Sequence, residues 1–164
     1  MSAAFTMAWQ HAAGLIMPEQ LPMRAAELLA AGEDSPALRD LAGRSRHEDT
    51  AELGQLFRQT LADLGQDVPD EDTVGRCLLH HLAAGLEAGE VTATEVCTRL
   101  WDGGAAETDL EKAFLRAAVD AVEYVDYYEL YNPAAYRAWE EKLRAAARAL
   151  AAERATGPLG AGGS

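Results

Sequence analysis

The sequence has few of the residues and segments that mark secreted or membrane proteins. It contains only two cysteines in 164 residues, Cys77 and Cys97, which is too few for a disulfide framework. Both lie within apolar helical patterns, so we expect reduced, buried thiols. No run approaches the roughly 20 apolar residues that a membrane-spanning helix needs, and residues 1–17 lack the basic start of a signal peptide. We therefore expect a cytoplasmic protein.

Motifs of common enzyme classes are also missing. The sequence has no glycine-rich phosphate loop, no dinucleotide-binding fingerprint, no CxxC pair and no metalloprotease-type histidine helix. Only four serines occur, and none lies in a nucleophile-elbow context. Ser35, followed by Pro36, is better explained as a helix cap than as a nucleophile. These absences disfavour nucleotide-dependent and hydrolytic enzymes, and we expect no cofactor.

Positive charge is scarce. The formal net charge is −13 at pH 7, with a pI near 4.6. A surface this negative repels phosphate backbones and anionic lipids, so we expect neither direct nucleic-acid binding nor membrane binding. The same field would steer a basic protein partner towards the chain. The alternative interpretation is that the acidity serves solubility alone.

What the sequence does contain is helical periodicity. Hydrophobic residues make up 49% of the chain and recur at helical spacing between glycine and proline breakers. We predict an all-α fold, a single irregular bundle of seven or eight helices, with one domain over residues 1–156 and a flexible C-terminal tail over residues 157–164. The expected helices cover residues 3–13, 22–31, 36–43, 50–64, 74–88, 93–102, 108–131 and 133–155.

One group of residues has the chemistry of metal ligands. Cys77 and His81 share a helix face next to His80, and Cys97 could approach from the following helix. This cluster supports the alternative function, a helical metal- or small-ligand-binding protein or enzyme. The competing interpretation places Cys77 in the core with one histidine partly exposed.

An acidic and aromatic stretch gives the preferred contact surface. Asp120, Glu123, Tyr127 and Tyr131 are spaced by three, four and four residues along one side of the expected helix over residues 108–131. Tyrosines provide amphipathic contact area and carboxylates provide charge complementarity. The segment 102–131 holds eight acidic residues and two basic ones. Two alternatives remain open: a carboxylate pair that serves acid/base chemistry or holds a cation, and a solvated acidic face beside core tyrosines.

The last expected helix is rich in basic residues and carries an apolar stripe. Tyr136, Trp139, Leu143 and Leu150 follow a near-heptad spacing over only two heptads. This pattern favours packing within the chain over a dimer seam. We expect the chain to be a monomer or a homodimer.

Two segments resemble small uncharacterised helical proteins of actinobacteria. The first segment is LPMRAAELLAAG at residues 21–32, which continues as DSPALRDLAG at residues 34–43. The second is LAAGLEAGEVT at residues 82–92, continuing to Leu100 and Trp101. Some proteins of this kind are associated with toxin immunity. From the charge, the tyrosines and the missing motifs we predict a non-enzymatic, acidic protein-binding domain. The resemblance implies that it is an immunity- or antitoxin-like inhibitor of a basic protein, and the residues that carry the resemblance give no catalytic assignment.

Overall fold

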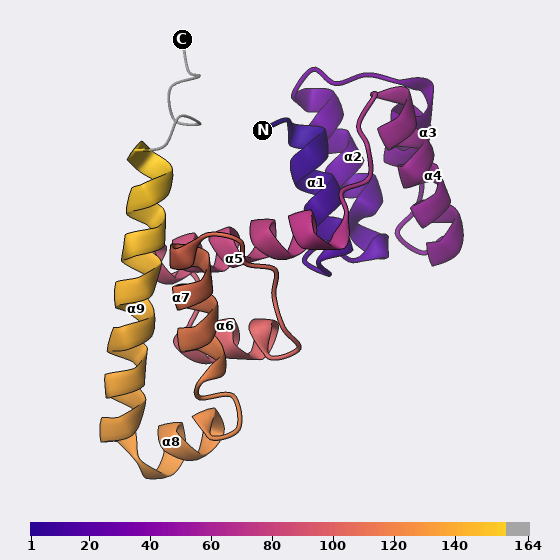
Figure 1. Ribbon diagram of the computed structural model, residues 1–164. Coiled ribbons are helices and arrows are strands. Elements are labelled where there is room, and N and C mark those ends of the chain that lie inside the picture. The colour runs from indigo at the N-terminus through magenta and orange to yellow at the C-terminus, as the bar shows by residue number, and fades with distance from the viewer. Residues whose placement is uncertain (157–164) are drawn as a thin grey trace. The chain divides into compact units, whose positions relative to one another are not determined.

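The computed structural model describes residues 1–156 and the side chains of residues 1–153 (Figure 1). This part of the chain is helical and contains no strand, so the predicted all-α fold is confirmed. It holds nine α-helices and one short 3-10 helix, rather than seven or eight helices. No helix within it is both long and apolar enough to span a bilayer. The predicted tail, residues 157–164, lies outside the described residues.

The contacts divide the chain into two compact units, of which the first is Met1–Val74. Within it α2 packs on α3, and α3 packs on α4. The apolar faces of these helices enclose one core, formed mainly by Leu21, Leu38, Leu41, Leu53 and Phe57. The helices of this unit are α1 (Ala3–Ala12), η1 (Pro18–Gln20), α2 (Leu21–Ala30), α3 (Pro36–Ala42) and α4 (Thr50–Asp63).

The second unit begins at Gly75, within α5. In this unit α9 lies alongside α7, and the short α8 connects the two (Figure 1). The core residues that are shielded most completely include Leu86, Val96, Phe114, Leu143 and Leu150. The helices are α5 (Glu71–Ala88), α6 (Ala93–Leu100), α7 (Asp109–Val119), α8 (Val125–Tyr131) and α9 (Pro133–Thr156).

The sequence predicts a single irregular bundle, whereas the described residues form two compact units by their contacts. The buried apolar residues of the described part form two clusters, one in each unit. Apolar periodicity shows which face of a helix is buried, but it does not show which other helix covers that face. The single domain over residues 1–156 stays a prediction.

Helix starts agree with the capping patterns in the sequence. The Ser35 Oγ accepts a hydrogen bond of 3.0 Å from the Leu38 N–H, as expected of a cap followed by proline. Thr92 and Glu95 form a capping box at the start of α6. The start of α5 lies earlier than predicted because Asp70 accepts a hydrogen bond of 2.7 Å from the Thr73 N–H.

The prediction of one helix over residues 108–131 is wrong. The chain leaves the α-helical path at residues 120–124, where the Tyr124 N–H bonds the Ala121 carbonyl at 2.9 Å in a tight turn. Ala121 and Val125 on either side of this turn are both buried in the core of the second unit. The turn directs α8 against α6 and α9. Residues 120–124 contain neither glycine nor proline, so tertiary packing places the break and no local signal marks it.

Candidate functional site

The structure does not gather the candidate metal ligands Cys77, His80, His81 and Cys97 into one site. Among the described residues, no group of three or more histidine, cysteine or acidic side chains is placed to hold a metal ion. Cys97 is fully buried, and this burial, followed by the charge of Asp126, raises the pKa of its thiol. Cys77 is half-buried and His81 is exposed. His80 is directed elsewhere, because its ring pairs with the carboxylate of Glu111.

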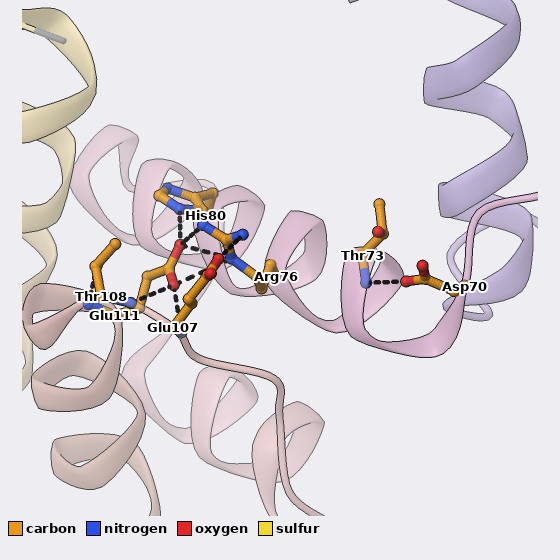
Figure 2. A network of polar contacts seen from close by, with 7 residues as sticks. All are labelled: Asp70, Thr73, Arg76, His80, Glu107, Thr108 and Glu111. Atoms are coloured by element: carbon orange, nitrogen blue, oxygen red, sulfur yellow. Dashed lines mark hydrogen bonds and ion pairs between the residues drawn. The ribbon is translucent and has the colours of Figure 1, made fainter.

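Glu111 is the centre of a polar network that the sequence patterns did not indicate. Only 1% of its side chain is exposed. Arg76 Nη2 donates to Glu111 Oε1 at 3.0 Å, and His80 Nε2 lies 2.8 Å from the same oxygen. Figure 2 shows Arg76 and His80 reaching from α5 towards Glu111 on α7, with Glu107 on the preceding loop. Arg76 also forms an ion pair with Glu107.

Backbone donors complete the coordination of this carboxylate. Glu111 Oε2 accepts from the N–H of Glu107 at 2.7 Å and from the N–H of Thr108 at 3.0 Å. Burial by itself raises the pKa of Glu111, but the hydrogen bonds from Arg76, the Glu107 N–H and His80 outweigh it and lower the pKa to about 2. The carboxylate is therefore ionised at neutral pH.

The network joins α5, α7 and the loop before α7, and we interpret it as structural. A buried carboxylate with so low a pKa is a poor general base, because it binds a proton weakly near neutral pH. The signal for it was present in the sequence. Thr108 and Glu111 have the same capping-box spacing as Thr92 and Glu95, although no pattern indicated that Arg76 would join them.

The first unit has a shallow groove of about 400 Å³ along α4. Arg44 at its edge donates to Asp40 Oδ1 and to Glu48 Oε2, each at 3.0 Å. The cation is thus already paired with two carboxylates, so the groove does not offer it to an anionic ligand. The groove is lined by Arg44, Glu48, Glu52, Leu53, Gln55, Leu56 and Gln59.

The second unit exposes a concentration of large side chains on α8 and the turn before it. Leu130 and Tyr131 are 72% and 73% exposed, and Tyr127 is 59% exposed. Tyr124 is also exposed, and Tyr128 is half-buried. We call this group, with Glu123 and Asp126, the α8 surface. The alternative of core tyrosines beside a solvated acidic face would place Tyr124 and Tyr128 in the core, but Tyr124 is exposed.

The four tyrosine rings of the α8 surface form a continuous series. The ring centroids of Tyr124 and Tyr128 are 5.9 Å apart, and those of Tyr127 and Tyr128 are 6.3 Å apart. Tyr127 and Tyr131 are closer, at 5.2 Å with an interplanar angle of 37°. These distances are typical of aromatic pairs that stabilise one another. The rings therefore present a joined aromatic patch rather than four separate side chains.

The four residues predicted as the contact surface are all exposed, but they do not line one helix. Asp120 is the C-cap of α7 and lies 3.5 Å from Lys142 Nζ on α9. Glu123 lies in the turn, whereas Tyr127 and Tyr131 belong to α8. Of the predicted intervals of three, four and four residues along one helix, only the last, from Tyr127 to Tyr131, lies within a single helix. The chain leaves the helical path between Asp120 and Tyr127.

The sequence patterns missed several members of this surface. Tyr124 and Leu130 are exposed because the turn at residues 120–124 rotates α8 away from the direction of α7. All five tyrosines of the chain lie between residues 124 and 136, and this crowding was a signal that could have indicated the whole patch.

Comparison with models of protein families, with curated proteins and with solved structures gave no match to this chain.

Proposed function

We propose that this protein binds a basic protein partner through the α8 surface. The observation that carries the proposal is the exposure of Tyr124, Tyr127, Leu130 and Tyr131 within eight consecutive residues. Large apolar side chains that gather on a surface are typical of interaction sites, whereas scattered ones need no explanation. Tyrosine is also among the residues that contribute most to binding energy at protein interfaces.

The packing of α8 supports this interpretation. Val125 is the buried residue of this seven-residue helix, so most of its large side chains do little for the core. A partner would remove the apolar and aromatic surface of α8 from water. This burial contributes a favourable free energy of roughly 25 cal/mol per Å² of apolar surface. The side chains of α8 are therefore better explained by binding than by folding.

Charge sets the class of partner. No lysine or arginine occurs between Arg116 and Arg137, and this interval contains four acidic residues. Glu123 and Asp126 are exposed and adjoin Tyr124 and Tyr127 in the sequence. A basic partner would be attracted by the overall charge of −13 and would meet uncompensated carboxylates at the contact. Acidic partners would be repelled at both stages.

In its concrete form, the proposal is a stoichiometric inhibitor of the immunity or antitoxin kind. Such a protein acts by covering a basic functional surface of its target, so it needs affinity and charge complementarity but no catalytic group. The α8 surface offers apolar contact area for affinity and carboxylates for charge complementarity. This form of the proposal rests on the acidic charge, the exposed tyrosines and the resemblance noted for residues 21–43 and 82–101.

The experiment compares three forms of the purified full chain as bait for basic proteins at low salt. The test variant is Tyr127→Ala/Tyr131→Ala. The matched control is Met23→Ala/Val68→Ala, which removes two apolar side chains that are 56% and 62% exposed in the first unit. Proteins captured by the wild type and the control, released by rising salt, are then purified and their dissociation constants measured.

We expect the test variant to bind the purified partner at least about tenfold more weakly, as for the loss of interface tyrosines. The control should bind as the wild type does. If an identified basic partner binds all three forms equally well, the α8 surface is not the contact and the proposal is overturned.

A further inference from the structure

We propose that the α8 surface recognises arginine side chains in particular, so that its partner presents an arginine-rich segment. The inference rests on the proposed function, because it names the chemistry that the same surface would bind. It is drawn from the joined tyrosine rings and from the carboxylates next to them. The rings favour arginine over lysine, and the carboxylates attract a cation.

The aromatic patch offers ring faces to a planar cation. Tyr127 and Tyr131 are the most exposed tyrosines, and their ring centroids are 5.2 Å apart. A guanidinium group is planar and weakly hydrated, so it stacks on aromatic faces, whereas the lysine ammonium is a compact and strongly hydrated charge. Attraction between a cation and a ring face contributes about 0.5–1 kcal/mol at exposed sites. Several connected rings can accept more than one arginine.

Exposed carboxylates stand next to the tyrosines in the sequence. Glu123 precedes Tyr124, and Asp126 precedes Tyr127, and all four side chains are exposed. An arginine stacked on a ring can direct its N–H groups to a neighbouring carboxylate in a bidentate arrangement. Glu129 is less available, because its Oε2 accepts a hydrogen bond of 3.1 Å from Thr94 Oγ1. Glu123 and Asp126 are therefore the acidic residues that we assign to this recognition.

A second copy of the chain is the other possible occupant, since α9 carries several arginines. Two molecules of net charge −13 repel one another, and this repulsion opposes self-association at low salt. A strongly basic segment gains from the same charge instead. The observations therefore favour a basic partner over a homodimer through this surface.

The test uses the full chain and synthetic peptides of one sequence in three forms, carrying arginine, lysine or uncharged citrulline at the same positions. Calorimetry at low salt measures each dissociation constant. We expect the arginine peptide to bind about tenfold more tightly than the lysine peptide, the range that cation–π contacts with two rings allow. The citrulline peptide, which keeps the shape but loses the charge, should bind more weakly than either.

Two variants separate the ring from its hydroxyl. Tyr127→Phe/Tyr131→Phe keeps the ring faces and should retain the preference for arginine, whereas Tyr127→Ala/Tyr131→Ala should reduce arginine binding to about the level of lysine. Equal affinity for the arginine and lysine peptides, or no measurable binding of either, overturns the inference. So does a wild-type dimer that the alanine variant converts to monomer in sedimentation, since the second copy would then be the occupant.

The failure of this inference is distinguishable from that of the proposed function. If the peptides show no arginine preference but an identified basic partner still depends on Tyr127 and Tyr131, only the arginine assignment fails. If the alanine variant leaves the binding of partner and peptides unchanged, both fail.

Discussion

His80 Nε2 lies 2.8 Å from the Oε1 atom of Glu111, across the contact between α5 and α7. The same carboxylate receives Arg76 and two backbone N–H groups. A buried charge is tolerated only when it is paired and fully hydrogen-bonded, and removing one partner from such a group is strongly destabilising. This relationship makes Glu111 a structural residue whose loss can be measured directly.

Glu111→Gln should lower the free energy of unfolding by about 2–4 kcal/mol. The amide group carries no charge to compensate Arg76, and its NH2 would face donors where the carboxylate accepted hydrogen bonds. Urea unfolding followed by circular dichroism measures the change. The matched control is Glu107→Gln, because Glu107 also pairs with Arg76 but its side chain is 74% exposed; its effect should stay within about 1 kcal/mol. Equal effects of the two substitutions would contradict the structural role of Glu111.

The stability contributed by Glu111 should depend on pH. Its pKa is lowered from 4.5 to about 2 in the folded chain, so the unfolded state binds a proton more tightly than the folded state does. The contribution is therefore fully present above about pH 5 and is lost as the pH falls from about 4.5 towards 2. The shift corresponds to about 3 kcal/mol.

Unfolding of wild type and Glu111→Gln at a series of pH values from about 6 to 2 tests this dependence. The difference in stability between them should shrink as the pH falls, because the wild type alone loses the contribution of this ionised carboxylate. Other acidic groups are common to both proteins and largely cancel. A difference that stays constant over this range would show that the pKa of Glu111 is not lowered by folding.

Gly75→Ala should destabilise the second unit. A Cβ atom at this position would lie 2.9 Å from both the Cβ and the backbone N of Ala105, and backbone cannot move aside easily. Crowding of this kind typically costs about 1–3 kcal/mol, which exceeds the gain of up to about 1 kcal/mol in helix propensity. Chemical denaturation gives the net loss.

The control for this substitution is Gly54→Ala in α4. There the new Cβ would meet only the end of the Arg58 side chain, at 3.9 Å. The change should be neutral or stabilising by up to about 1 kcal/mol, since alanine is the better helix former. If Gly75→Ala were equally harmless, the close approach of α5 to residue 105 would be wrong.

Aromatic residues of the α8 surface and of the core should respond differently to substitution. Tyr127→Ala/Tyr131→Ala removes exposed rings and should change the unfolding free energy by no more than about 1 kcal/mol. Trp139→Phe removes the buried hydrogen bond of 2.7 Å from Trp139 Nε1 to the Ala117 carbonyl and should cost about 1–3 kcal/mol. A large loss from the tyrosine variant would mean that these rings serve the fold.

The correct part of the sequence-based prediction concerns features that act over a few residues. Ser35, Thr92 and Asn132 begin helices where their side chains can satisfy free N–H groups. Gly65 and Gly89 follow helices, with φ values of 68° and 74° that residues with a side chain rarely adopt. Caps and terminators of this kind are local, so the sequence indicates them without any knowledge of the neighbouring helices.

The candidate site was predicted only in part, because its geometry depends on contacts between residues that are distant in sequence. Tyr127 and Tyr131 were identified by their type and spacing, and both are exposed. The break between Asp120 and these tyrosines depends on burying Ala121 and Val125 in the core of the second unit, which is a tertiary contact. The histidines and cysteines do not form one cluster, because His80 pairs with Glu111, which is 31 residues away in sequence.

By itself, the sequence determined that the chain is helical, where most helices start, and that its charge is strongly negative, because these properties depend on residue type and on neighbours within one or two turns. Tertiary structure alone decided that the described residues bury two separate cores, that Glu111 is buried among donors, and that the helix predicted to reach Tyr131 breaks after Val119. Each of these depends on which apolar faces meet, and residues distant in sequence decide that.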